Sequence, residues 1–409
     1  MVYFLRLSLL FLVLFIKEEV YGQYEGVLYG DIVLKDRSIL TGAIRWSGAQ
    51  MLYSDVLLVA KSEPYALKYL NRNQIHALTT QNEGIDWEFM NLWKDKTPDT
   101  RGEPLCRFGD IYSIHVTGPG KAQIFLKNGS KVRVATDRTE SRHLGKDIAV
   151  FNPQYKKIPW EKISRVNFKN YPQDFDPFRA ELLYGRIVTK QGEFTGFIQW
   201  DKTKFLTSQR LEGKLNDSDK TDTEYSFSTI AGIEKRDRGA LVKFRSDSKV
   251  FLKNNRDVNA TNHGIVVMHP DWGRVVVEWE DFVSARFTKA PDNLGYSSYQ
   301  KPGRIYAIVK TTDGGVFKGN SIFDLDEQWN VELLEGSSGN THYQIPFKFI
   351  RSLKVNGEQE SKVTLIDNRV LTLSNHNDVT GNNWGIVVLL VNSGHKYIPW
   401  NKVREISFR

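Results

Sequence analysis

Three stretches of the chain repeat one pattern: Gly42-Ala-Ile-Arg-Trp46, Gly196-Phe-Ile-Gln-Trp200 and Gly319-Asn-Ser-Ile-Phe323. A second pattern follows later in each case, at Ile158-Pro-Trp160, Val277-Glu-Trp279 and Ile398-Pro-Trp400. The tryptophans of this second pattern stand 119 and 121 residues apart. A period so nearly constant predicts three tandem copies of one structural unit.

Each copy is expected to consist of short β-strands, because apolar and polar residues alternate along it. In the second copy a strand at 185–190, a turn at Gln191-Gly192 and a strand ending at Trp200 follow one another. Another hairpin recurs in the second half of each copy, at 124–134, 242–252 and 363–373. We therefore predict about four or five strands in each half, enough for a small barrel or half of a sandwich.

The first halves, with their order of strand, tight turn, strand, glycine and strand, resemble SH3-like barrels, and Gly319–Leu333 resembles an Sm-type barrel. The second halves, which carry Ile-Pro-Trp before an apolar pair, resemble PRC-type barrels. The resemblance implies an all-β fold of three tandem repeats, each of two small SH3-like β-barrel or sandwich modules. It implies no functional residue.

The two repeated patterns and the amino-terminal apolar run predict four regions: a signal peptide at 1–22, and β repeats at 23–169, 180–288 and 304–409. Pro-rich and Gly-rich segments between the repeats are expected to be linkers. The first repeat is longer by about 35 residues, which we place at about 82–118. Within them Ile85, Phe89, Leu92 and Trp93 fall on one helical face, which predicts an inserted amphipathic helix.

The amino terminus predicts export. Arg6 precedes an apolar run at 7–16, and Val20-Tyr-Gly22 offers a cleavage site before Gln23. The run is too short to span a bilayer, so a secreted or periplasmic protein without a transmembrane segment is expected. A buried helix or an uncleaved anchor is the alternative. The single cysteine, Cys106, excludes a disulfide framework and is expected to be packed.

Loops rich in Asn and Asp precede the Ile-Val strands of the second and third copies, and they supply the first candidate binding residues: Asp257, Asn259, Asn262, Asp378 and Asn382. Such side chains stabilise turns by bonding to the backbone. They also suit contact with a ligand or peptide, or with Ca²⁺. The first copy carries Arg142 and His143 there, so no shared metal site is predicted.

The inserted helix supplies the other candidates, Trp87, Phe89 and Trp93. They are interpreted as contacts to a ligand, or as a plug for the open end of a barrel. The repeated tryptophans could stack on sugar rings, but their spacing favours a place in the core. No nucleophile elbow, metalloprotease motif, phosphate-binding loop or Cys-x-x-Cys occurs, so no catalytic residue, metal or cofactor is predicted.

The favoured hypothesis is an exported, non-enzymatic β-repeat protein that binds a protein or polysaccharide at the cell envelope or outside the cell. A secreted polysaccharide hydrolase is the alternative, and a pocket joining two acids such as Asp257 and Glu280 would favour it. A nucleic-acid-binding, Sm-like protein is the second alternative. The formal net charge of +8 is spread along 409 residues without a long basic run, so no nucleic-acid partner is expected.

Overall fold

The structure is a computed structural model that describes residues 26–47, 50–83, 98–102, 105–136, 143–172, 181–269, 272–291, 295–390 and 394–409. The predicted signal peptide and the predicted helix that carries Trp87, Phe89 and Trp93 lie outside the described residues. The described chain is nearly all β, as predicted, and its strands form large antiparallel sheets. None of its helices is long and apolar enough to cross a membrane.

We call residues 26–172, 181–291 and 295–409 segments 1, 2 and 3. Segment 1 contains β1 (Tyr29–Leu34), β2 (Ile39–Arg45), β3 (Val56–Leu57), β4 (Ala60–Lys61), α1 (Arg72–Glu83), β5 (Cys106–Arg107), β6 (Ile111–Gly118), β7 (Lys121–Leu126), β8 (Lys131–Ala135), β9 (Ile148–Phe151), β10 (Tyr155–Ile158) and β11 (Ile163–Phe168). Segment 2 contains β12 (Tyr184–Thr189), β13 (Gly192–Gln199), β14 (Arg210–Gly213), β15 (Thr223–Ser226), β16 (Ile230–Arg236), β17 (Gly239–Phe244), β18 (Lys249–Lys253), β19 (Ile265–His269), β20 (Gly273–Val277) and β21 (Phe282–Thr288). Segment 3 contains β22 (Tyr306–Thr311), β23 (Val316–Phe323), β24 (Leu333–Ser338), β25 (Thr341–Pro346), β26 (Ile350–Val355), β27 (Glu360–Leu365), β28 (Val370–Ser374), β29 (Ile386–Leu390), β30 (His395–Ile398) and β31 (Val403–Phe408).

The same five-stranded order of pairing, here called unit A, occurs in all three segments, whereas the second order, unit B, is continuous only in segment 3. In segments 1 and 2 the outer strands of unit B form separate two-stranded sheets, β3–β5 and β14–β15. In segment 3 a five-stranded unit A pairs in the order β30-β29-β23-β22-β31, and unit B pairs in the order β25-β24-β28-β27-β26. Unit A of segment 2 is β20-β19-β13-β12-β21, and that of segment 1 is β10-β9-β2-β1-β11. The last strand of unit A also pairs with unit B, as β11–β6, β21–β16 and β31–β26.

The units do not coincide with the predicted halves of a copy. Unit B is inserted in the chain between the second and third strands of unit A, so the first predicted half mixes strands of both units. Both units contain a hairpin, a 3-10 helix and a third strand in that order, as in β29–β30 with β31 and β24–β25 with β26. The two units therefore differ in which of their strands comes first along the chain. Strands that pair across a long stretch of sequence leave no local pattern of residues. The predicted boundary between the two halves of a copy therefore differs from the boundary between units A and B.

The glycine of the first pattern is required where two strands approach closely. Gly42 lies opposite Gly30 on β1, and Gly196 lies opposite Gly185 on β12. A Cβ atom at Gly42 would stand 2.3 Å from the Phe151 carbonyl oxygen, and one at Gly319 would stand 1.9 Å from that of Leu389. Only glycine therefore fits at this point in each segment, because a neighbouring strand's backbone occupies the place of a side chain.

The aromatic residues of the two patterns meet in the core. The rings of Trp46 and Trp160 are 6.2 Å apart and nearly perpendicular at 80°. Trp200 with Trp279, and Phe323 with Trp400, repeat this contact at 6.4 and 5.9 Å. One phenylalanine from unit B and another from the end of unit A complete each cluster: Phe108 and Phe168, Phe227 and Phe287, and Phe347 and Phe408. All three tryptophans of the second pattern are buried, which confirms their predicted place in the core.

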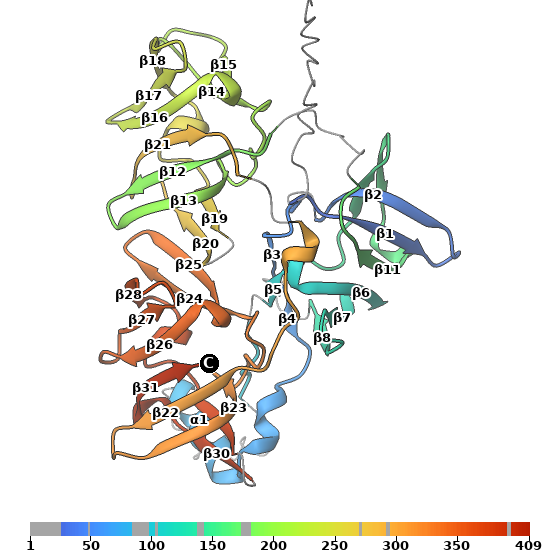
Figure 1. The fold of residues 1–409 in the computed structure, drawn as a ribbon, viewed down its shortest axis with the longest axis vertical. Coiled ribbons are helices and arrows are strands. Elements are labelled where there is room, and N and C mark those ends of the chain that lie inside the picture. Colours follow the sequence, from blue (N-terminus) through green and yellow to red (C-terminus); the bar gives the residue numbers. More distant parts are fainter. Residues whose placement is uncertain are drawn as a thin grey trace, which may run out of the picture.

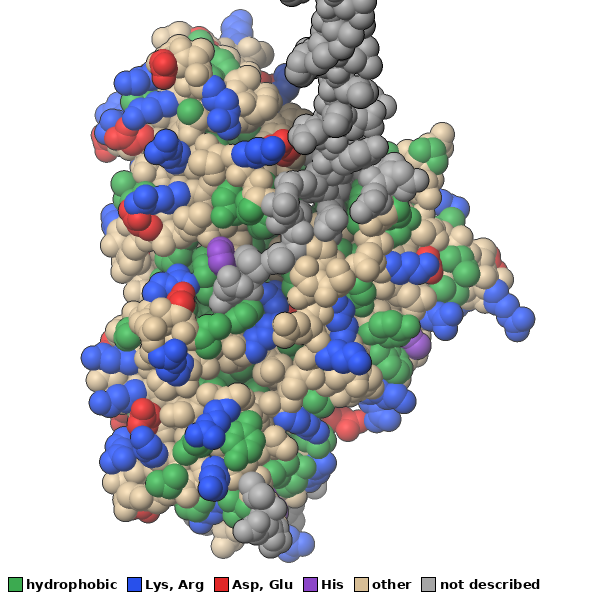
Figure 2. Space-filling model, in the orientation of Figure 1, with side chains coloured by type: hydrophobic (Ala, Val, Ile, Leu, Met, Phe, Trp, Pro, Cys, Tyr) green, Lys and Arg blue, Asp and Glu red, His purple; other side chains and the backbone are tan. Residues whose placement is uncertain are grey.

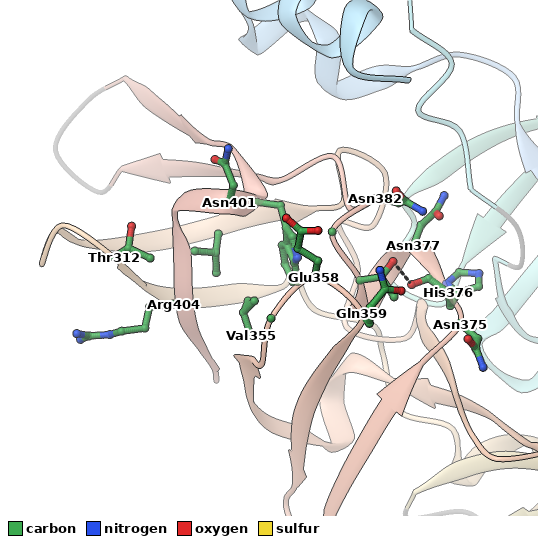
Figure 3. Close-up of a pocket in the computed structure, with 15 residues that line it drawn as sticks. Thr312, Val355, Glu358, Gln359, Asn375, His376, Asn377, Asn382, Asn401 and Arg404 are labelled. Atoms are coloured by element: carbon green, nitrogen blue, oxygen red, sulfur yellow. Dashed lines mark hydrogen bonds between the residues drawn. The ribbon is translucent and has the colours of Figure 1, made fainter. Parts of the chain in front are cut away.

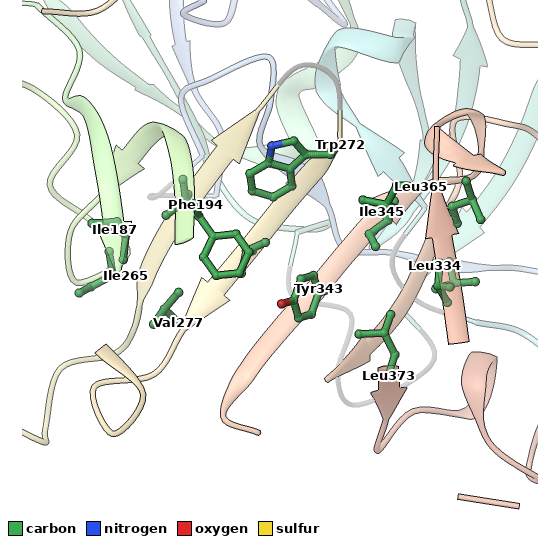
Figure 4. Packing of buried hydrophobic residues seen from close by; sticks show 14 of the residues in the cluster. Ile187, Phe194, Ile265, Trp272, Val277, Leu334, Tyr343, Ile345, Leu365 and Leu373 are labelled. Atoms are coloured by element: carbon green, nitrogen blue, oxygen red, sulfur yellow. The ribbon is translucent and has the colours of Figure 1, made fainter. Parts of the chain in front are cut away.

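Segments 2 and 3 are joined edge to edge. Strand β20 pairs with β25, from Arg274 opposite Gln344 to Val277 opposite Thr341. Phe194 packs 5.8 Å from Trp272 and 5.9 Å from Tyr343 across this seam (Figure 4). In Figure 1 the two segments accordingly form one column, with segment 2 above segment 3.

Segment 1 lies beside this column instead of extending it (Figure 1). Buried Lys61 forms ion pairs with Asp326 at 3.2 Å and with Glu332 at 2.6 Å in segment 3. Gln199 of segment 2 donates to Asp55 at 2.6 Å. The predicted linker before segment 3 is partly a core element, because Tyr296 and Tyr299 are buried in the core of segment 1.

The extra residues of segment 1 are placed differently from the prediction at 82–118. Strand β6, at Ile111–Gly118, is the counterpart of β16 and β26, so it belongs to the shared fold. The added residues fall between β4 and β5, where segment 3 has the short turn between β24 and β25. The distance between the repeated glycine and the repeated tryptophan gives the length of the insertion, but it does not give its position between them.

The insertion carries α1, which the sequence analysis did not predict. Asn71 and Gln74 form a reciprocal cap, with each side chain accepting from the other's backbone N–H at 2.9 Å. Leu78 packs with Val387 and Tyr397 of segment 3. The insertion therefore reaches across to cover part of segment 3 (Figure 1). Cys106, at its end, is fully buried and reduced, as expected.

We expect Gly42→Ala to lower the free energy of unfolding by about 2–4 kcal/mol, because the new methyl group meets backbone that cannot move aside. Gly118→Ala is the matched control. Its added Cβ atom meets nothing closer than the Lys121 side chain at 3.9 Å. Denaturant unfolding monitored by tryptophan fluorescence gives both values, and equal losses would contradict the close-approach argument.

Candidate functional site

The predicted Asn and Asp loops are held together by their own hydrogen bonds. In segment 2, Asp257 is buried, accepts from the Glu212 backbone N–H at 2.8 Å and forms an ion pair with Lys204. Burial raises the pKa of the Asp257 carboxyl, although Lys204 acts in the opposite direction. Asn259 accepts from the Thr261 N–H at 2.8 Å. These oxygens fix the loop, as the turn interpretation expects.

Segment 3 repeats the arrangement with the same spacing. Asp378 is buried and accepts from the Glu335 N–H at 2.6 Å. Asn383 accepts from the Gly385 N–H at 2.8 Å, as Asn262 does from that of Gly264 at 2.9 Å. Asn383, not the predicted Asn382, is therefore the counterpart of Asn262. Asn382 is exposed.

Segment 1 performs the same task with a histidine. The Leu58 N–H donates to His143 Nδ1 at 3.0 Å, as the Glu212 N–H donates to Asp257. The Trp46 indole donates to the His143 carbonyl at 2.7 Å, and the Trp200 indole donates to that of Asp257 at 2.9 Å. The shared function of this position is thus structural. Within the described residues no group of three or more His, Cys, Asp or Glu side chains could hold a metal ion.

A large open cleft lies beside the loop in segment 3. Its volume is about 970 Å³, and the turn between β26 and β27, the loop at 375–382 and the 3-10 helix at Trp400–Lys402 surround it (Figure 3). Five amide side chains line it: Gln359, Asn375, Asn377, Asn382 and Asn401. All five are exposed. An amide offers both donors and an acceptor, so this lining suits a ligand that carries both.

The buried edge of the cleft carries an unsatisfied donor. Trp400 lines the cleft and is 4% exposed, and its indole N–H has no hydrogen-bond partner. Its counterpart Trp160 donates to the Gly118 carbonyl at 3.1 Å, at the turn between β6 and β7. In segment 3 the corresponding turn runs over 356–359, and Gly357, Glu358 and Gln359 line the cleft. A buried polar group without a partner is costly, which points to an external acceptor at this position.

The rim of the cleft also carries a histidine between two acids. His376 Nε2 lies 3.3 Å from Glu335, and its Nδ1 lies 3.2 Å from Asp378. Burial lowers the pKa of His376, but the two carboxylates outweigh it and raise the value to about 9. Burial raises the pKa of Glu335 to about 7. The His376 ring therefore links its own loop, through Asp378, to Glu335 on β24.

The prediction of site residues from sequence was partial. Of the predicted residues, Asn382 lines the cleft, Asp378 lies under it, and Asp257, Asn259 and Asn262 stabilise the loop of segment 2. Gln359, Asn401 and the Trp400 N–H were not predicted. Asn401 stands where segment 2 has Glu280, and comparing the copies at this position could have identified it.

No protein-family model matches the chain, and no curated protein matches it. Among solved structures, selenomethionine-substituted virginiamycin B lyase from Staphylococcus aureus is 10% identical over 71% of this chain and 84% of its own, with a TM-score of 0.11. A superposition at that score carries no argument about the fold or the function of this chain.

Trp160→Phe and Trp400→Phe test the unsatisfied donor without any ligand. Trp160→Phe removes a hydrogen bond and should lower the free energy of unfolding by about 1 kcal/mol. Trp400→Phe keeps the ring and removes only the partnerless N–H, so it should leave stability unchanged or raise it. Denaturant unfolding measures both, and an equal loss in the two variants would show that the Trp400 N–H has a partner.

His376→Gln tests the charge on the rim. The pKa of His376 is higher in the folded state, at about 9, than its ordinary value of 6.5. The protonated side chain therefore stabilises the folded state fully at pH values below 6.5, and this stabilisation is lost as the pH rises through about 9. The variant should therefore be destabilised most at pH 6 and least above pH 9, in thermal unfolding at a series of pH values. His395→Gln, at an exposed site on β30, is the control and should show no such trend. A loss independent of pH would contradict the ion-pair interpretation.

Proposed function

We propose that the chain is an exported, non-enzymatic binding protein, built from three tandem copies of a domain that each contain two small SH3-like barrels. The recurring pairing order and the three aromatic clusters support the tandem copies. The apolar run at 7–16 supports export to the envelope or the extracellular space. The cleft of segment 3 is the binding site in this proposal.

The ligand that fits the cleft best is a neutral oligosaccharide, or a chain end of a polysaccharide. The partnerless Trp400 N–H is the observation that carries this proposal. Sugar hydroxyls both donate and accept, and the five lining amides do the same. A bound peptide would need an exposed strand edge or apolar pockets for its side chains, and neither feature dominates this lining.

The acids of the cleft support binding over hydrolysis. A glycosidase of the usual kind needs two carboxyl groups about 5–9.5 Å apart on either side of the scissile bond. Among the described residues that line the cleft, Glu358 is the only carboxylic acid. Asp257 and Glu280, the pair that would favour a hydrolase, do not line this cleft.

The distribution of surface charge supports glycan binding over nucleic-acid binding. Lys and Arg side chains are scattered over the face shown in Figure 2, with acidic side chains among them, and form no continuous stripe. A groove that follows a phosphate backbone concentrates such side chains.

The test is a glycan array followed by calorimetric titration of the purified protein with the oligosaccharides that bind. We expect binding by neutral glycans, with affinity reduced at least about tenfold in the double variant Asn382→Ala/Asn401→Ala. Glu280→Ala, at the position of segment 2 that corresponds to Asn401, is the matched control and should bind normally.

Two outcomes would overturn the proposal: no neutral glycan binds, or binding persists in the double variant. New reducing ends released from a bound glycan would instead establish the hydrolase.

A further inference from the structure

The seam between segments 2 and 3 shows how two units of this fold associate edge to edge. Strand β20, the last strand of the sheet of segment 2, pairs antiparallel with β25, the outer strand of unit B in segment 3. Arg274 lies opposite Gln344 and donates to its side chain at 2.5 Å. Strand β20 belongs to unit A, which recurs in every segment, and a strand stands at the position of β25 in each segment, directly before the cluster phenylalanine of unit B and one 3-10 turn ahead of β6, β16 or β26.

One counterpart of each of these two strands has an open edge in the described chain. Strand β10 of segment 1 corresponds to β20, because Ile158 and Val277 both stand two residues before the repeated tryptophan. Strand β15 of segment 2 corresponds to β25, because each directly precedes a cluster phenylalanine, Phe227 or Phe347. Within the described chain β10 pairs only with β9, and β15 pairs only with β14. Segment 1 lies beside the column (Figure 1), and no pairing joins β10 to β15 within the described chain.

The two open edges carry opposite charges. Transferring the register of the β20–β25 seam places Tyr155 opposite Glu224, Lys156 opposite Thr223 and Lys157 opposite Asp222. Lys156, Lys157, Asp222 and Glu224 are all exposed. Opposite charges at facing positions stabilise a strand pair and steer the partners into register.

The existing partners of these side chains leave room for a new contact. Lys157 lies 3.0 Å from Asp147, and Glu224 accepts from Arg210 at 2.7 Å. Asp222 accepts from the Asn255 amide at 2.8 Å. Each contact is at the surface, where an ion pair is worth little and exchanges readily. The exposed Tyr155 ring would gain cover, since it is 57% exposed.

We propose that β10 of one molecule pairs antiparallel with β15 of a second copy of this chain, in the register of the β20–β25 seam. The contact joins two different surfaces, so it continues head to tail into a ring or a filament. It is more charged than the seam, where Phe194, Trp272 and Tyr343 pack together (Figure 4). The assembly is therefore weak, reversible and sensitive to salt. It also places several carbohydrate clefts in one particle, which raises avidity if the proposed function holds.

Sedimentation velocity of the full chain over a concentration series tests this contact without any ligand. We expect the average mass to rise with concentration at about 0.05 M salt and to fall toward the monomer at about 0.5 M. Lys156→Glu/Lys157→Glu and Asp222→Lys/Glu224→Lys should each remain monomeric, because each puts like charges on the two edges. An equimolar mixture of the two variants should associate again, because each then meets a complementary edge.

Lys318→Glu/Lys362→Glu makes the same change of charge on exposed positions of β23 and β27, and it should associate as the unmodified protein does. A protein that stays monomeric at low salt and high concentration would overturn the proposal. Association that survives both reversals, or that the mixture fails to restore, would overturn it as well. Loss of glycan binding with assembly intact would count against the proposed function alone.

Discussion

The perpendicular pair of aromatic rings between the first and second sequence patterns is the contact on which each segment depends. Trp46 ends a strand of unit A, Trp160 begins its 3-10 helix, and Phe108 of unit B packs against Trp46. Buried aromatic rings contribute large areas and prefer tilted or edge-on geometry. The cluster therefore does more than fill a core. It lies where the last strand of unit A also pairs with unit B, as β11 does with β6.

The sequence predicted what is local and missed what is distant. The predicted turn at Gln191-Gly192 is present, with Gly192 at positive φ, and the predicted hairpin at 363–373 is β27–β28. These features are recorded in neighbouring residues. The insertion of unit B into unit A is not, since β23 and β29 pair across a gap that encloses five other strands. The burial of Tyr296 and Tyr299 in segment 1 could not be predicted either. A stretch rich in Gly and Pro predicts a linker, and its composition does not show whether another part of the chain packs on it.

The candidate site illustrates how a repeated loop acquires a role in one copy. The same hydrogen-bonding position is filled by His143, Asp257 and Asp378, and in each case it accepts a backbone N–H. Composition alone marked these loops as rich in oxygen, and the structure shows that most of those oxygens are already occupied. What distinguishes segment 3 lies next to the loop. The turn between β26 and β27 is built differently from that between β6 and β7, so the indole of Trp400 lacks the acceptor that Gly118 supplies to Trp160.

The same reasoning applies to the edges of the sheets. Strands that correspond to β20 and β25 recur in the other segments, but within the described chain the β20–β25 pair alone joins two segments edge to edge. Lys61 and Gln199 hold segment 1 against the side of the column through buried polar contacts. A buried ion pair contributes little net stability compared with an apolar contact of the same size, but it specifies one arrangement. Here the buried polar contacts of Lys61 and Gln199 favour the position of segment 1 beside the column. In that position the outer edges of β10 and β15 stay without a paired strand in the described chain.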